Sequence, residues 1–178
     1  MEGGSYLTVI FTKAGYITAH RRVNVGWNTH AVTNTVQMPA VDTAETDIVF
    51  DGNGNTIMTH TATEVSDEFG SRTATMVFTG DNQAYLQDEE GNDVQELAAI
   101  TVRATEFATQ KSMPSELPAN SAFTYCTELQ ADGAKRVRFK NPVTVWVDNF
   151  LGFEVGSAVP VGYYDRDKAQ WIPRTMEP

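Results

Sequence analysis

Oxygen-bearing side chains stand at every second position of one short polar run, as Asp51, Asn53 and Asn55, with glycines between them. Carboxylate and amide oxygens in a flexible loop are typical ligands of Ca²⁺. An EF-hand loop would continue to a bidentate glutamate at its twelfth position, but that position is Ala62, and Glu64 comes two residues later. Because glycine and asparagine tolerate positive φ, the run favours the tip of a β-hairpin. A calcium site is the alternative.

A second cluster of oxygen ligands lies between positions 88 and 93 and includes Asp88, Glu90 and Asn92. The chain carries 13 Lys and Arg against 23 Asp and Glu, a formal charge of -10. Carboxylates held close together can attract a divalent cation. A solvated loop explains the cluster without a metal, and this interpretation is preferred. We therefore expect no cofactor, with Ca²⁺ at either turn as the alternative.

The remaining metal-binding and nucleophilic side chains form no recognised pattern. His20, His30, His60 and the single Cys126 match no zinc spacing, and one cysteine cannot form an internal disulfide. No G-x-S-x-G elbow frames a serine. We expect a protein that is not an enzyme. Cys126 is then a small apolar residue, and the histidines are surface or cross-strand polar groups.

Self-modification is a further alternative, because threonine-rich bacterial sandwiches can form Lys–Asn isopeptide bonds beside a buried carboxylate. Such a bond requires three residues that are buried together. The sequence offers many asparagines and the lysines Lys13, Lys111, Lys135 and Lys140.

Aromatic residues are concentrated after position 140. The alternation in Val143–Asp148 places three valines on one face of a strand and Trp146 on the other. A continuous apolar strand of this kind favours burial between two layers. A platform on which sugar rings stack is the functional alternative. The aromatic residues are Trp146, Phe150, Phe153, Tyr163, Tyr164 and Trp171.

Composition and charge restrict the class of protein. The chain of 178 residues contains 22 Thr and 18 Val, which fit a pleated strand better than a helix. No basic stripe is present to displace counterions from phosphates, so we expect no nucleic-acid partner. No apolar run approaches the roughly 20 residues that a membrane span requires, so we expect no membrane insertion.

Short alternating segments recur along the chain, and none shows a convincing helical period. This spacing predicts an all-β fold, an antiparallel β-sandwich built as two small sandwich units in series. Residues 39–47 form the predicted connector between domains, and residues 63–70 are the one place where a helical turn is considered. The predicted strands cover residues 5–12, 16–25, 31–38, 48–50, 56–63, 72–79, 84–86, 98–109, 123–129, 136–140, 143–147, 159–164 and 170–172.

The first hairpin resembles a known domain. Residues Leu7–Tyr16 end in a Lys-x-Gly-Tyr turn and are followed by a Val-x-Val strand. This pattern resembles the closing hairpin of carboxypeptidase regulatory-like (transthyretin-like) domains. The resemblance covers residues 5 to about 38 and implies that residues 1–40 are the last strands of such a sandwich, as in an N-terminally trimmed domain.

A longer series of segments spans roughly residues 46 to 174. Its most specific strings are Asp148–Phe153 and Pro160–Asp165. The series resembles segments of very large bacterial surface or secreted proteins that carry Rhs/YD repeats. The full series consists of Ile100–Phe107, Met113–Pro118, Phe123–Leu129, Val137–Val143, Val145–Phe153 and Val159–Asp165, followed by Trp171.

The layout of these segments is also similar to the ZU-five/UPA pair of β-sandwiches. This similarity implies a ZU-five-like sandwich over residues 46–110 and a UPA-like sandwich over residues 111–178. Some ZU-five domains cleave themselves at a His-Phe-Ser motif, which this sequence lacks. The resemblances imply a non-catalytic structural or interaction module of an extracellular or cell-surface bacterial protein. Its partners would be neighbouring domains of the parent chain, with another protein or a glycan as the adhesive alternative.

Overall fold

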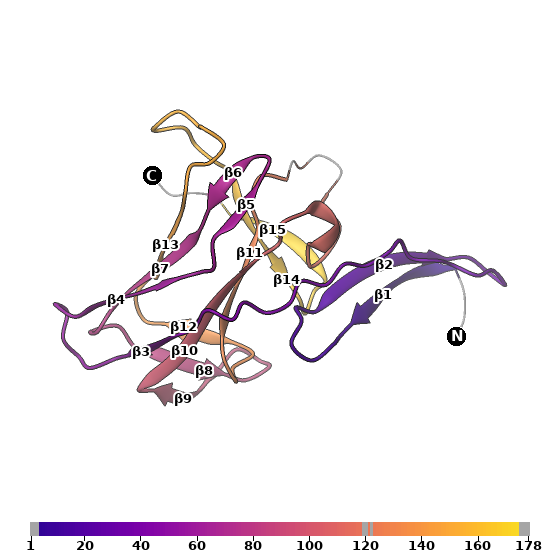
Figure 1. Ribbon diagram of the computed structural model, residues 1–178. Helices are drawn as coiled ribbons and strands as arrows, with labels where there is room; N and C mark the ends of the chain where they lie inside the picture. The colour runs from indigo at the N-terminus through magenta and orange to yellow at the C-terminus, as the bar shows by residue number, and fades with distance from the viewer. Residues whose placement is uncertain (1–3, 119–120, 122, 175–178) are drawn as a thin grey trace. The chain divides into compact units, whose positions relative to one another are not determined.

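Antiparallel strands make up nearly all the regular structure of the computed structural model, which describes residues 4–118, 121 and 123–174 (Figure 1). Within those residues the only helix is one 3₁₀ turn, η1 (Gln110–Ser112). The expected all-β, antiparallel sandwich-type fold is confirmed. The strands are β1 Ser5–Phe11, β2 Ala19–Val25, β3 Thr46–Val49, β4 Ile57–Thr61, β5 Val65–Asp67, β6 Gly70–Arg72, β7 Ala74–Thr79, β8 Ala84–Gln87, β9 Asp93–Leu97, β10 Ala99–Glu106, β11 Thr127–Ala131, β12 Val137–Phe139, β13 Thr144–Val147, β14 Val161–Asp165 and β15 Gln170–Arg174.

The chain divides into two compact units, and neither unit is a continuous segment. Unit 1 comprises residues 1–41, 107–126 and 153–178, and unit 2 comprises residues 42–106 and 127–152. The chain therefore passes four times from one unit to the other. Both the first and the last segments of the chain belong to unit 1, so unit 2 is inserted within it.

This division differs from the predicted consecutive regions 1–40, 46–110 and 111–178. The reason is strand pairing across the predicted boundary, because β10 pairs with β11, β8 with β12 and β7 with β13. The first passage between the units, at Val41 and Asp42, does lie inside the predicted connector at residues 39–47.

Unit 1 contains two hairpins and a small apolar core. Strands β1 and β2 pair so that Leu7 faces Val23, and β14 pairs with β15 so that Tyr164 faces Trp171. The core consists of the buried residues Ile17, Phe107 and Met113, against which several half-buried residues pack. Cys126 is one of these, as expected of a small apolar side chain. The half-buried residues are Val41, Leu117, Phe123, Cys126 and Trp171.

Unit 2 contains three three-stranded antiparallel sheets and one short hairpin. In the sheets, β10 lies between β11 and β3, β8 between β12 and β9, and β7 between β13 and β4, while β5 and β6 form the hairpin. Strand β7 alternates, so that Met76 and Phe78 are buried and the residues between them are half-buried. The Phe78 ring lies 5.8 Å from that of Phe139 of β12, which joins two of the sheets in one core.

Two predicted elements are wrong. Residues 31–38 alternate like a strand but join no sheet, and Val32 is 90% exposed. Alternation does not show whether a segment finds a partner strand, and none of the described strands pairs with this one. Residues 63–70 form β5 and the turn into β6 instead of a helical turn, because Asp67 accepts the Phe69 amide and Gly70 adopts φ 120°.

The described residues contain no helix with the length and apolar character needed to cross a membrane.

Candidate functional site

The first predicted calcium turn, between β3 and β4, is held by its own hydrogen bonds. The Asp51 carboxylate accepts the Asn53 amide at 2.9 Å and the Thr56 hydroxyl at 2.9 Å. The Asn53 side-chain oxygen accepts the Asn55 amide at 3.0 Å. The bond from the Asn53 amide and the bond from Thr56 lower the pKa of Asp51. The alternating oxygens therefore build consecutive Asx turns at a hairpin tip.

The second predicted turn, between β8 and β9, has the same character. The Asp88 carboxylate accepts both the backbone amide of Asn92, at 2.8 Å, and its side-chain amide, at 3.1 Å, which lowers the pKa of Asp88. Glu90 is exposed. Across residues 4–118, 121 and 123–174, no group of three or more His, Cys, Asp or Glu could hold a metal ion. The six predicted ligands thus lie in two separate turns, and both aspartates are already hydrogen-bonded within their loops.

The three histidines occupy unrelated environments. His20 in β2 is 5% exposed, and its Nδ1 lies 3.0 Å from the Tyr164 hydroxyl within unit 1. His60 in β4 is 1% exposed, and its Nδ1 lies 3.1 Å from Thr46 Oγ1 within unit 2. His30 alone lies on the surface. The histidines therefore form neither a metal site nor a catalytic group with one another.

His60 is electrostatically notable because its Nε2 is buried without a hydrogen-bond partner among the described residues. Burial lowers the pKa of His60 from its ordinary value of 6.5, and the Asp42 carboxylate only partly opposes this. The unfolded chain therefore takes up a proton at this residue at a higher pH than the folded unit does. The resulting contribution to stability is present above pH 6.5 and is lost as the pH falls.

We expect the free energy of unfolding to fall as the pH is lowered from about 7 to about 5, and to fall less in His60→Asn, which cannot be protonated there. Urea unfolding at a series of pH values measures both slopes. His30→Gln is the matched control, since it replaces an exposed histidine. Equal slopes for wild type and His60→Asn would contradict this account of His60.

The lysines offered for an isopeptide bond all have exposed side chains. Lys13 lies over the Tyr16 ring at 3.8 Å from its centroid, and Lys135 pairs with Glu89 at 3.3 Å. Lys111 and Lys140 are exposed as well. Because a Lys–Asn bond needs its three residues buried together, this arrangement does not favour self-modification by any of the four.

The late aromatic residues do not form one platform. Phe153, Tyr163, Tyr164 and Trp171 belong to unit 1, while Trp146 and Phe150 belong to unit 2. In unit 1 the rings of Tyr164 and Trp171 pack against each other with centroids 5.3 Å apart.

The predicted burial of Trp146 is wrong, because this side chain is 64% exposed. Strand β13 is an edge strand, and its pairing with β7 covers only one side of it. The strand registers place Trp146 opposite Thr75, and Thr75 opposite Thr61 of β4. Directly opposed residues of antiparallel strands point to the same face. The outer face of this sheet therefore presents an indole beside a row of threonine hydroxyls.

A cluster that the sequence did not indicate lies at the end of β10. Arg72 is 4% exposed and all five of its N–H groups have acceptors. The guanidinium bonds Asp67 at 2.7 Å and Glu106 at 2.5 Å, and its remaining N–H reaches the Gly70 carbonyl at 3.3 Å. The Phe150 ring lies 4.5 Å from the guanidinium carbon, which is a cation–π contact.

The same strand end also holds the two points at which the chain enters unit 2. The Thr105 hydroxyl accepts the Asp42 amide at 2.9 Å, and the Thr105 carbonyl accepts the Thr127 hydroxyl at 3.2 Å. Asp42 and Thr127 follow passages between the units, and Glu106 precedes one. We call this group the exit cluster. It comprises Asp42, Asp67, Arg72, Thr105, Glu106, Thr127 and Phe150.

Within the exit cluster, burial and the groups around each carboxylate shift its pKa in opposite directions. Burial raises the pKa of Glu106, and the Arg72 guanidinium opposes this increase. The hydrogen bonds that Arg72 donates to Asp67 and to Glu106 raise the pKa of Arg72, which keeps the guanidinium charged. Burial would raise the pKa of Asp42, but bonds from Thr63 and Ala44 outweigh it and lower that pKa. The two carboxylates around Arg72 are thus matched to a permanent positive charge.

The sequence places Arg72 and Glu106 within two predicted strands but carries no signal that they meet. They lie 34 residues apart, so only the strand order could show that they meet.

Comparisons of the chain with family models, with curated proteins and with solved structures found no match.

Proposed function

We propose that the chain is a non-catalytic structural module, a spacer or scaffold, of an extracellular bacterial protein of the Rhs type. The assignment to that class of parent protein rests on the sequence resemblance of residues 46 to 174. The role as a scaffold is supported by how the polar side chains are used. Carboxylates and arginines of unit 2 bond to its own turns and strand ends, as at Asp51, Asp88 and Arg72.

The exit cluster is the observation that carries this proposal. A module that transmits tension between its neighbours is pulled at the segments where the chain enters and leaves it. Those segments must therefore be held together. In unit 2 these segments begin at Asp42 and end near Phe150. Asp42 is bonded to Thr105, and Phe150 covers Arg72, which holds the adjacent Glu106. Both ends of the unit are therefore fixed to one strand, β10.

Unit 1 connects the first and last segments of the chain directly. The Arg166 guanidinium donates to the Thr18 carbonyl at 2.8 Å, and His20 Nδ1 lies 3.0 Å from the Tyr164 hydroxyl. Tension applied through the two ends of the chain passes through the β1–β2 hairpin and these contacts before it reaches unit 2. Unit 2 is loaded only after they break.

Pulling on a single molecule through its ends tests this role. We expect two cooperative steps, with unit 1 opening first and unit 2 second. The second step should release residues 42–152, on the order of 400 Å of chain at about 3.6 Å per residue. Optical tweezers measure both the force and the length of each step.

A chain that extends gradually at low force, without cooperative steps, would contradict the scaffold role. Opening of both units in a single step would contradict the proposed order. Intact mass provides a control on the material, because loss of one ammonia would reveal an isopeptide bond and two fragments would reveal self-cleavage.

Binding of a neutral glycan is a second candidate function, favoured by the exposed indole of Trp146 beside Thr75 and Thr61. Sugar rings present C–H groups that stack on an aromatic face, while their hydroxyls pair with hydroxyls such as those of threonine. The row formed by Trp146, Thr75 and Thr61 contains no charged residue, although the chain as a whole has a formal charge of -10. A neutral ligand suits this face better than an acidic one.

For this second function we expect Trp146→Ala to weaken oligosaccharide binding about fivefold or more, since the stacking surface is lost. Titration calorimetry with cellohexaose and xylohexaose measures the affinity. Trp27→Ala is the matched control, because Trp27 is 70% exposed and belongs to unit 1. Absence of binding to either sugar, or an equal loss in both variants, would remove this candidate.

A further inference from the structure

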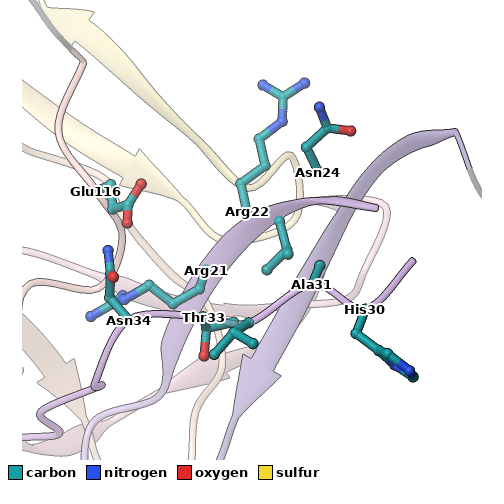
Figure 2. Close-up of a pocket in the computed structure, with 10 residues that line it drawn as sticks. Arg21, Arg22, Asn24, His30, Ala31, Thr33, Asn34 and Glu116 are labelled. Carbon is teal, nitrogen blue, oxygen red and sulfur yellow. The ribbon is translucent and has the colours of Figure 1, made fainter. Parts of the chain in front are cut away.

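A polar cleft of about 390 Å³ lies along β2 in unit 1 (Figure 2). One wall is formed by Arg21, Arg22 and Asn24 of β2, and the other by the segment from His30 to Asn34. The Glu116 carboxylate lies at one end, on the side to which the Arg21 side chain extends. A volume of this size is within the range of ligand-binding clefts.

Arg21 is a buried cation without a matching anion. It is 6% exposed, and its guanidinium donates to the carbonyls of His20 at 2.7 Å, Lys111 at 3.0 Å and Met113 at 3.3 Å. No ion pair involves Arg21 in the part of the chain that the structure describes. Glu116 acts on it only at longer range, and burial lowers the pKa of Arg21. A buried charge held only by carbonyl dipoles favours an anionic ligand.

On the side of the cleft, β2 has backbone N–H and C=O groups that form no backbone hydrogen bond among the described residues. The His20 amide points away from β1, because it donates to the Pro114 carbonyl at 2.7 Å. Backbone groups alternate in direction along a strand, so those of Arg22 and Asn24 point the same way. Neither has a backbone partner on that side among the described residues. This open edge can accept the main chain of an added strand.

The opposite wall of the cleft does not fill this edge. Residues 30–34 run beside β2 but form no ladder with it, and the side chains of Thr33 and Asn34 make no hydrogen bond within the described residues. The space between the two walls is therefore bounded by backbone on one side and by polar side chains on the other. An extended peptide matches this combination better than a compact ligand does, because it offers main-chain bonds and side chains at once.

The charges at the cleft select the type of peptide. Arg21 and Arg22 line it, His30 stands at its far end, and Glu116 is its only carboxylate. Arg22 lies over the Tyr6 ring at 4.3 Å and has no ion-pair partner within the described residues. The cleft is therefore a cationic patch on a chain of formal charge -10. An acidic segment is complementary to it, and a basic segment is not.

We propose that this cleft binds an extended, acidic peptide segment of a partner protein. The main chain of the segment adds to the edge of β2 at Arg22 and Asn24, and one of its carboxylates pairs with Arg21. This interaction goes beyond the proposed scaffold role and does not depend on it, so either can fail alone.

The probe is the peptide acetyl-Thr-Val-Glu-Val-Thr-amide, and its control replaces the Glu with Gln. Titration calorimetry on the full chain should show saturable binding of the Glu peptide and at least about tenfold weaker binding of the Gln peptide, as expected for loss of a charged hydrogen bond. Arg21→Gln should weaken binding of the Glu peptide by a similar factor and leave binding of the Gln peptide nearly unchanged.

Backbone pairing is tested separately, which also covers the case in which Arg21→Gln does not fold. Asn24→Pro removes an amide from the open edge of β2 without disturbing the bonds of β2 to β1. This variant should weaken binding of the Glu peptide. Thr8→Pro removes the equivalent outward amide from the free edge of β1 and should leave binding unchanged.

Four results would overturn the proposal. The first is the absence of saturable binding of the Glu peptide at millimolar concentration. The second is equal affinity for the Glu and Gln peptides, and the third is an equal effect of Asn24→Pro and Thr8→Pro. The fourth is slow hydrogen exchange of the Arg22 and Asn24 amides in the free protein, which would mean that residues 30–36 already occupy the edge.

Discussion

The ion-pair cluster around Arg72 is the interaction on which the arrangement of unit 2 depends. Its guanidinium joins the β5–β6 hairpin, through Asp67, to the last residue of β10, Glu106. The neighbouring Thr105 fixes the chain where it enters at Asp42 and where it returns at Thr127. A buried cation with matched acceptors is costly to leave unpaired, so it specifies one position for the strands that supply its partners. The proposed scaffold role rests on this constraint, because the ends of unit 2 are held at one place.

Unit 1 contains the opposite electrostatic situation. Arg72 uses all five of its N–H groups on nearby acceptors and has two carboxylate partners, whereas Arg21 has carbonyl acceptors only. Both guanidinium groups are buried. Arg72 therefore stabilises the fold, whereas Arg21 can still bind an anionic ligand. The cleft beside Arg21 also adjoins a strand edge that has no neighbouring strand among the described residues, and edges of this kind are either protected or used for binding.

The fold class could be predicted from the sequence because a high content of threonine and valine, together with two-residue alternation, is typical of strands. The hairpin tip at Asp51 could be predicted for the same local reason, since Asx turns form within a few residues. Alternation could not show whether residues 31–38 find a partner strand, or that β13 is an edge strand that exposes Trp146. The exit cluster and the Arg21 cleft depend on contacts between segments distant in sequence, for which a single sequence carries no local signal.

The central claim is that Arg72 holds the ends of unit 2 together, and equilibrium unfolding of two arginine variants tests it most directly. Arg72→Met leaves Glu106 buried and unpaired, and urea unfolding should show a loss of about 3 kcal/mol in the free energy of unfolding. Arg138→Met removes an arginine of β12 that pairs with Asp93 at the surface, and it should cost much less. If both variants lose the same small amount of stability, the exit cluster does not hold unit 2 and the account is contradicted.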